Sequence, residues 1–172
     1  MKSFSVSMFL ALAVLLSSEV ASAQVSFPAG RYAIVNVNSG LSMSVRLDSY
    51  DNGANIHQWL DYSGSLGQRW YILPTGDGYF MLQNVRSGKV ADIEGPTTVN
   101  SGNIHQWQYL GLDSQKWSVV RIGQNPAYYV FINKYSGKAM DVANNSAANG
   151  ANIHQWEYLG LTSQQWQVVG PS

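Results

Sequence analysis

The segment NGANIHQWEYLGLTSQQW occupies residues 149–166, and near-copies of it lie twice upstream. They read NGANIHQWLDYSGSLGQRW at residues 52–70 and NSGNIHQWQYLGLDSQKW at residues 100–117. All six tryptophans and all three histidines of the chain fall inside these copies. A phrase this unusual, present three times, predicts a structural unit that is itself repeated three times.

The same interval recurs outside the quoted phrase. His57, His105 and His154 are separated by 48 and then 49 residues, and so are the turn sequences NVNSG, NVRSG and NKYSG, which begin at Asn36, Asn84 and Asn133. The sequence therefore predicts three repeats at about residues 27–75, 76–122 and 123–170, which together span one domain.

Each unit contains four short β-branched and aromatic runs separated by turn residues. In the third unit we expect strands at about 128–133, 138–142, 151–156 and 164–169. No window keeps the apolar spacing of an amphipathic helix. Three such units predict an all-β fold of about twelve strands without a helix, closed about a pseudo-threefold axis because closure removes exposed sheet edges.

Three triplets near the ends of the repeats resemble a known signature. Gln68-Arg69-Trp70, Gln115-Lys116-Trp117 and Gln164-Gln165-Trp166 are similar to the Q-x-W motif of ricin-B-type β-trefoil lectins and carbohydrate-binding modules. The SGKVADI and SGKAMDV segments and the N-I-x-x-W runs also fit that family. The resemblance covers about residues 27–169. It implies a β-trefoil of three pseudo-symmetric four-strand repeats that binds carbohydrate.

The amino terminus has the three parts of a secretory signal peptide. Lys2 precedes an apolar run too short to span a bilayer, and Ala21-Ser22-Ala23 matches a cleavage site. We therefore expect residues 1–23 to be removed and residues 24–172 to form a single secreted domain. No further domain is expected after Pro171-Ser172, which favours a free-standing lectin over a module attached to an enzyme.

Composition narrows the classes of partner. The chain has ten basic and ten acidic residues and no basic run, which argues against nucleic acid and anionic membranes. It has no cysteine, so a thiol-metal or redox role is excluded. No long apolar segment follows the signal, so membrane insertion is not expected.

The two tryptophans of each copy are predicted to differ in role. Trp70, Trp117 and Trp166 lie among apolar residues of a strand and are expected to fill the core. The glutamine of each Q-x-W triplet is expected to hydrogen-bond the backbone of the adjoining loop and hold the repeat closed.

The resemblance also implies two binding sites. In those lectins an aspartate fifteen residues before the first tryptophan accepts sugar hydroxyls, and the aromatic ring stacks on the pyranose; Asp92 and Asp141 hold that position before Trp107 and Trp156. The aspartates are expected at the rim of a cleft. The predicted sugar-binding residues are Asp92, His105, Trp107, Ser114 and Gln115 in the second repeat, and Asp141, His154, Trp156, Ser163 and Gln164 in the third. Tyr109 and Tyr158 either line the same clefts or are buried under the loops.

The first repeat departs from this pattern. The position fifteen residues before Trp59 is Ser44, and neither Asp48 nor Asp51 matches it. Without a carboxylate, the site formed by Ser44, His57, Trp59 and Gln68 is expected to be weak or lost. The resemblance implies a galactose- or N-acetylgalactosamine-type ligand, the commonest in the family. Relatives carry asparagine before the Q-x-W glutamine, where this chain has Gly67, Ser114 and Ser163, so the exact sugar does not follow from the resemblance.

Functions other than sugar binding fit the sequence less well. Three histidines could form a metal site, but residues beside the exposed tryptophans should point into three separate clefts, so neither a metal nor another cofactor is expected. No nucleophile motif or acid pair indicates an enzyme. Trefoils also serve as protease inhibitors or protein ligands, and a xylan-type polysaccharide-binding module without its enzyme is a further alternative. The tryptophan, histidine and aspartate at matched offsets favour a lectin for neutral glycans.

Overall fold

The computed structural model describes residues 25–123 and 127–171, so the predicted signal peptide lies outside the described residues. The strands are β1 (Ala33–Asn36), β2 (Ser42–Val45), β3 (Ile56–Trp59), β4 (Trp70–Pro74), β5 (Phe80–Asn84), β6 (Val90–Ile93), β7 (Ile104–Trp107), β8 (Trp117–Ile122), β9 (Tyr128–Asn133), β10 (Ala139–Val142), β11 (Ile153–Trp156) and β12 (Trp166–Val169). Between them lie single 3₁₀ turns, η1 (Arg46–Asp48), η2 (Leu66–Gln68), η3 (Asp113–Gln115), η4 (Ala143–Asn145) and η5 (Thr162–Gln164).

The described residues contain no α-helix, and the expectation of an all-β chain with about twelve strands is confirmed. The third repeat matches its predicted strands to within a few residues at each end. Among these described segments, none is a helix with the length and apolarity needed to cross a membrane.

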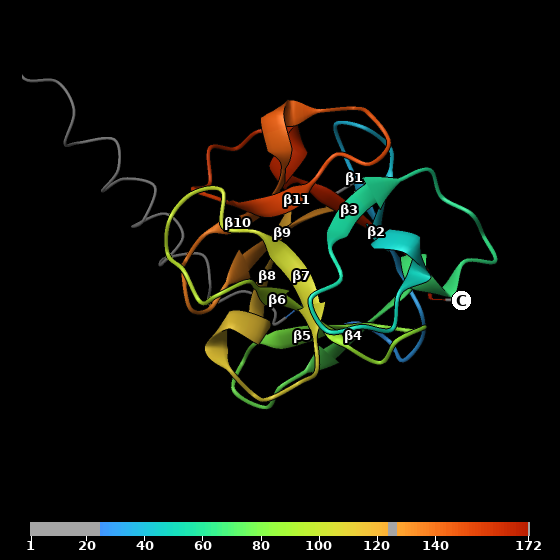
Figure 1. Ribbon diagram of the computed structural model, residues 1–172. Helices are drawn as coiled ribbons and strands as arrows, with labels where there is room; N and C mark the ends of the chain where they lie inside the picture. The colour runs from blue at the N-terminus through green and yellow to red at the C-terminus, as the bar shows by residue number, and fades with distance from the viewer. Residues whose placement is uncertain (1–24, 124–126, 172) are drawn as a thin grey trace, which may run out of the picture.

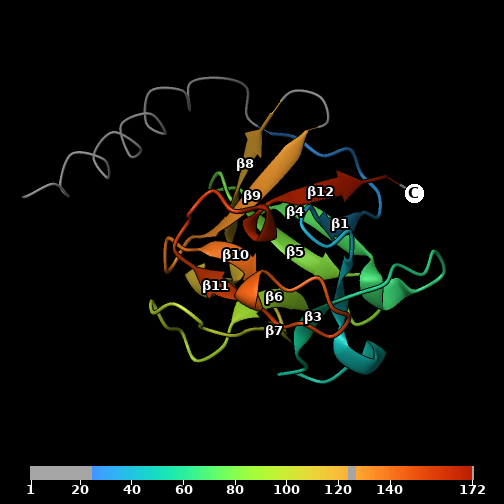
Figure 2. The same cartoon turned by 90° about the horizontal axis from the view of Figure 1, so that it is seen from above.

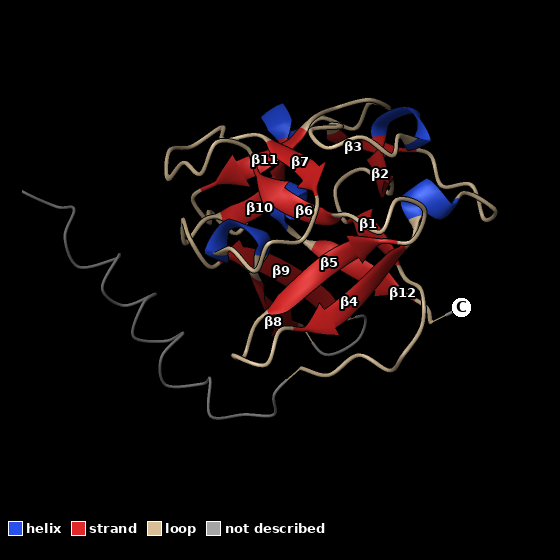
Figure 3. Cartoon of the chain, turned by 60° about the horizontal axis from the view of Figure 1, so that its bottom comes forward, coloured by secondary structure: helices blue, strands red, loops and turns tan. Residues whose placement is uncertain are grey.

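The strands form a barrel and three hairpins. The barrel strands follow the order β1, β12, β9, β8, β5 and β4, and an antiparallel bridge between Tyr32 and Trp70 joins the first to the last. The second and third strands of each repeat pair as the hairpins β2–β3, β6–β7 and β10–β11. Figure 3 shows these hairpins above the barrel strands, and Figure 2 shows the same two layers from another side. This arrangement is a β-trefoil.

The NxxSG turns join the first two strands of each repeat. Gly40, Gly88 and Gly137 adopt φ near +70°, a conformation that glycine accepts without a steric penalty. The asparagine that opens each turn is buried, and its amide donates to a backbone carbonyl beside a Q-x-W glutamine; in the second repeat, for example, Asn84 Nδ2 lies 3.0 Å from the Gly67 carbonyl. Each turn thus fixes the loop that precedes the core tryptophan of another repeat.

Three tryptophans fill the core, as the sequence predicted. Trp70, Trp117 and Trp166 are fully buried in one apolar cluster that includes side chains from all three repeats. Their indole N–H groups donate to the carbonyls of Met43, Ala91 and Met140 at 3.0–3.2 Å. Each ring therefore packs in the barrel and also joins it to the hairpin of its own repeat.

The repeated phrase also joins neighbouring repeats to one another. The glutamine of each IHQW strand is fully buried, and Gln106 Nε2 donates to the Ser49 and Asp51 carbonyls of the first repeat, both at 2.9 Å. Gln155 and Gln58 make the corresponding pairs of bonds to the second and third repeats. Figure 1 shows β3, β7 and β11, the strands that carry these glutamines, grouped near the centre. The three pairs of bonds link the first repeat to the third, the second to the first and the third to the second, and so form a closed ring.

These glutamine contacts lead to a stability prediction. In a Gln106→Leu variant the Ser49 and Asp51 carbonyls lose their donor, and each carbonyl left without a partner should lower the free energy of unfolding by about 1–3 kcal/mol. Urea denaturation followed by tryptophan fluorescence measures the loss. Gln108→Leu, two residues away and exposed, is the matched control and should unfold like the wild type. Equal stability of the two variants would contradict the role assigned to Gln106.

Candidate functional site

The hairpins place the predicted site residues opposite one another. In β6–β7 Asp92 pairs with His105, in β10–β11 Asp141 pairs with His154, and in β2–β3 Ser44 pairs with His57. Directly opposed residues of an antiparallel pair lie on the same face of the sheet. The histidine and the facing aspartate or serine of each repeat are therefore brought together, on three separate hairpins. The other predicted residues lie on the 3₁₀ turns, Gln68 on η2, Ser114 and Gln115 on η3, and Ser163 and Gln164 on η5.

The carboxylates lie next to the imidazoles. Asp141 Oδ2 is 3.4 Å from His154 Nε2, and the corresponding distance from Asp92 to His105 is 3.9 Å. Asp92 Oδ2 also accepts a hydrogen bond from Gln115 Nε2 at 3.1 Å. Both aspartates are only 6% exposed.

That burial corrects the expectation that Asp92 and Asp141 lie at the rim. The strands that hold them, β6 and β10, are buried at every position, and the facing histidines, His105 and His154, are buried as well. The two acids are therefore buried side chains of the hairpin strands and not residues of an exposed rim.

A tryptophan lies beside each histidine. The ring centroids of His57 and Trp59 are 5.5 Å apart with an angle of 24° between the ring planes, and the other two repeats have nearly the same geometry. Trp107 and Trp156 are partly exposed, and Trp59 is the most exposed of the three at 38%. Each site thus combines an accessible aromatic face with polar groups beneath it.

Several buried polar atoms at the second and third sites have no partner. Among the described residues, the atoms without a hydrogen bond are Asp92 Oδ1 and Ser114 Oγ in the second repeat, and Asp141 Oδ1 and Ser163 Oγ in the third. His154 Nε2 also makes no hydrogen bond, although it lies 3.4 Å from Asp141 Oδ2, and the remaining atom, Gln155 Oε1, belongs to the contact between repeats. A buried polar atom without a hydrogen bond costs about 1–3 kcal/mol, so these atoms gain by bonding a polar group that enters the site. Acceptors and donors of this kind suit the hydroxyl groups of a sugar.

The Q-x-W glutamines have the structural role predicted for them. Gln115 Nε2 donates to the Gln108 carbonyl and its Oε1 accepts from the Leu110 N–H, at 2.9 and 2.8 Å. Gln68 and Gln164 close their own loops in the same way. Of the two tyrosines left open, Tyr109 is 40% exposed, whereas Tyr158 is partly buried and its pKa is raised by that burial.

His57 differs from the other two histidines in its surroundings. Burial lowers its pKa below the ordinary value, and the positive charge of Arg46 lowers it further. Its partner across the hairpin is Ser44 rather than a carboxylate. His57 is therefore neutral at neutral pH and can either donate or accept a hydrogen bond.

The described part of the chain contains no group of three or more histidine, cysteine or acidic side chains placed to hold a metal ion. The three histidines lie on different hairpins, each stacked on its own tryptophan.

Comparison with known proteins identifies the family of this chain. A family model described as ricin-type β-trefoil lectin domain-like matches residues 22–107, 66–156 and 113–172. The chain belongs to this ricin-type lectin-domain family. No curated protein sequence matched the chain.

Solved structures resemble this ricin-type domain along most of its length. A designed threefold-symmetric protein, ThreeFoil, is 39% identical, with a TM-score of 0.79 over 83% of this chain and 99% of its own. An exo-β-1,3-galactanase from Clostridium thermocellum is 37% identical, with a TM-score of 0.78 over 83% of this chain, which spans only 30% of the galactanase. The Macrolepiota procera ricin B-like lectin, solved with lactose, shares the fold at 20% identity and a TM-score of 0.70, covering 84% of this chain and 98% of the lectin.

Two sets of residues in this ricin-type domain were missed by sequence reasoning. The sequence does not identify the buried glutamines Gln58, Gln106 and Gln155 as contacts between repeats; the only signal is their constant position between histidine and tryptophan in every copy. The offset of Asp48 differs from that of Asp92, yet Asp48 lines a cavity of about 550 Å³ in the first repeat together with Ser44, His57 and Trp59. Sequence offset alone does not reveal which side chain enters a pocket.

Proposed function

We propose that the protein is a secreted lectin that binds neutral glycans through the second and third repeats and acts by binding rather than by catalysis. The observation that supports this most directly is the set of unpartnered buried atoms at those two sites, Asp92 Oδ1 and Ser114 Oγ in one and Asp141 Oδ1 and Ser163 Oγ in the other. They lie with a stacked histidine and tryptophan, Trp107 or Trp156, which offers a flat apolar face to the C–H side of a pyranose.

Galactose-type sugars are the preferred ligand class in this proposal. The galactanase that is 37% identical over most of this chain is named for β-1,3-galactan. The serines in place of asparagine before the Q-x-W glutamines reach less far toward a ligand, so we propose galactose and N-acetylgalactosamine as a class and not one linkage. Each shallow site should bind a monosaccharide with a dissociation constant of about a millimolar, and multivalent glycans should gain by avidity.

A glycan array with residues 24–172, run with and without a chelator, tests the proposal. Binding to terminal galactosides that the chelator does not change is the expected result. Binding to none of the neutral glycans, or to peptides alone, would contradict it and favour a protease inhibitor or protein ligand.

A polysaccharide-binding module is the second candidate, because the galactanase match covers only 30% of that longer protein. Soluble β-1,3-galactan and xylan on the same array distinguish the two. Binding to internal units of these polymers, with no binding to terminal galactosides, would favour the module.

Secretion is part of the proposal and has its own measurement. Cleavage between Ala23 and Gln24 predicts a mature chain that begins at Gln24. Intact-mass spectrometry of protein recovered from the culture medium tests this. A full-length chain retained in the cells would contradict it.

A further inference from the structure

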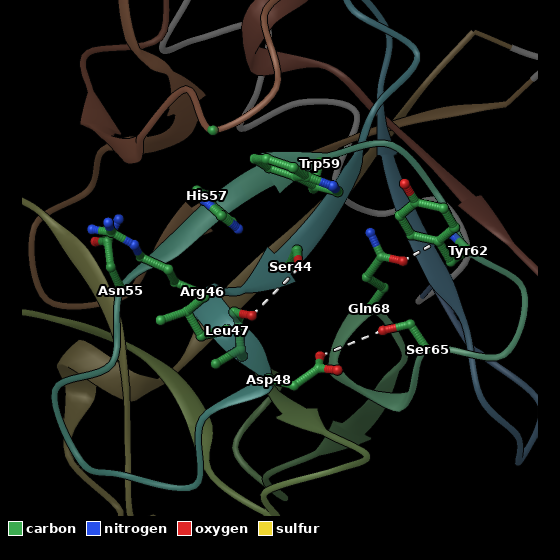
Figure 4. A pocket seen from close by; sticks show the side chains of 12 residues that line it. Ser44, Arg46, Leu47, Asp48, Asn55, His57, Trp59, Tyr62, Ser65 and Gln68 are labelled. Carbon is green, nitrogen blue, oxygen red and sulfur yellow. Dashed lines mark hydrogen bonds between the residues drawn. The ribbon is translucent and has the colours of Figure 1, made fainter.

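The first repeat contains a cavity at the position where sequence reasoning placed a weak or lost site. Its volume is about 550 Å³, and Ser44, Asp48, His57, Trp59 and Gln68 contribute to its walls. Figure 4 shows Trp59 and Asp48 on opposite sides of this cavity, with Ser44 between them. An aromatic face, a carboxylate and a neutral imidazole therefore face one space, although the carboxylate is not the one that the offset predicted.

Two coupled differences explain how Asp48 enters the cavity. The first repeat has Ser44 where the others have aspartate, and Gly67 where the others have Ser114 and Ser163. A Cβ atom at Gly67 would overlap Asp48 Oδ1. The carboxylate of Asp48 thus takes the space that a serine side chain occupies in the other repeats, and Ser65 Oγ donates to it at 3.4 Å.

The turn that presents Asp48 has a constrained backbone. Leu47 and Asp48 adopt φ of 56° and 51°, a left-handed conformation unfavourable for leucine, and the equivalent residues in the third repeat are asparagines, which tolerate it. Arg86 of the second repeat holds the turn: its Nε donates to the Asp48 carbonyl at 2.9 Å and its guanidinium lies over the Tyr50 ring. Such a conformation persists only where surrounding contacts fix it, and it is common at binding sites.

We propose that the first repeat is a third saccharide site, in which Asp48 on the η1 turn accepts the sugar hydroxyls in place of the carboxylate missing at Ser44, while Trp59 stacks on the ring. The proposal rests on the proposed lectin function, and its ligand is a neutral pyranoside. Because the acceptor approaches from η1 instead of β2, the sugar would lie in a different orientation. The first repeat should therefore rank glycans differently from the second and third.

Indole N–H signals in ¹⁵N-labelled protein report on each repeat separately. Trp59, Trp107 and Trp156 mark the three sites, and the buried Trp70, Trp117 and Trp166 serve as internal controls for the fold. Lactose, β-1,3-galactobiose and xylotriose are the probes, and Trp→Phe variants assign the signals. We expect all three site signals to shift on titration, with the Trp59 signal giving a different order of affinity for the three probes.

Substitutions test the role of Asp48. Asp48→Asn should weaken the titration of the Trp59 signal about tenfold or more while leaving the Trp107 and Trp156 titrations unchanged. Gly67→Ser, which displaces the Asp48 carboxylate without removing it, should have the same effect. Asp51→Asn is the matched control, because Asp51 follows in the same loop but does not line the cavity.

Each outcome of these titrations decides something different. Shifts at Trp107 and Trp156 with none at Trp59 would overturn the third site and leave the proposed function intact. A Trp59 titration unchanged by both Asp48→Asn and Gly67→Ser would overturn the role of Asp48. No shift at any of the three signals would overturn the proposed function itself, and the third site with it.

Discussion

Alanine at both Asp92 and Asp141 is expected to remove sugar binding from the second and third repeats while the trefoil stays folded. Each carboxylate supplies a charged acceptor, whose loss costs about 1.5–3 kcal/mol, or about ten- to a hundredfold in affinity at each site. The fold should tolerate the change because both Oδ1 atoms lack a hydrogen-bond partner within the protein, and Gln115, which donates to Asp92 Oδ2, keeps its bond to the Gln108 carbonyl. Titration of the Trp107 and Trp156 indole signals with lactose and β-1,3-galactobiose measures the loss.

The double variant also tests how the sites act together. Retention on galactoside-coated beads depends on several sites binding at once, so it should fall far more than the affinity of one site. Ser44→Ala, at the equivalent strand position of the first repeat, is the control and should leave the Trp107 and Trp156 titrations unchanged. Wild-type binding by the double variant, with the fold intact, would contradict the assignment of both aspartates.

The fold could be predicted from sequence because its main determinants are local and repeated. The NxxSG turns place a left-handed glycine at the same point of each repeat, and the apolar runs before and after them can form only short strands. The core role of Trp117 also followed from its apolar neighbours in the sequence. Closure of the three equivalent units about an axis then removes the exposed edges of the sheet.

The contacts between repeats could not be predicted in the same way. Gln155 reaches the carbonyls of Thr97 and Val99, more than fifty residues away, and nothing in a single sequence names those partners. In the sequence IHQW, a polar glutamine within a strand would be expected to face solvent. Only the packing of one hairpin against the next loop shows that it is buried.

The sequence predicts only part of each site. A residue offset indicates which residues pair across a hairpin, but it does not indicate which side chains from turns line the adjoining pocket. The fifteen-residue offset places Asp92 and Trp107 on the two paired strands of one hairpin, where Asp92 is opposite His105 and Trp107 is opposite Val90. Asp48 lies in a turn after its strand, and its entry into the cavity depends on the missing side chain at Gly67. The arrangement depends on two positions that are distant in the sequence, Asp48 and Gly67, and their contact is seen only in the three-dimensional structure.

Alanine at Trp117 is expected to destabilise the whole domain. The ring is fully buried, and its indole N–H donates to the Ala91 carbonyl at 3.2 Å, so the variant loses packing and leaves a buried carbonyl without its donor. Large-to-small substitutions of buried tryptophan cost about 3–5 kcal/mol. Domains of this kind are stable by only about 5–15 kcal/mol, so a large part of the total is lost.

Trp107→Ala is the matched comparison, since Trp107 lies ten residues earlier in the same copy of the phrase but is partly exposed. It should abolish the sugar response of the second repeat with a much smaller loss of stability, because its ring borders the surface. Urea denaturation monitored by near-ultraviolet circular dichroism gives the free energy of unfolding of both variants, and lactose titration gives their binding. If Trp117→Ala unfolded at the same urea concentration as Trp107→Ala, the division of the six tryptophans into three core rings and three site rings would be wrong. We therefore expect Trp117→Ala to be unstable, and Trp107→Ala to be stable but unable to bind sugar in the second repeat. The two variants differ because each copy of the repeated segment places one tryptophan in the barrel and the other on the hairpin above it.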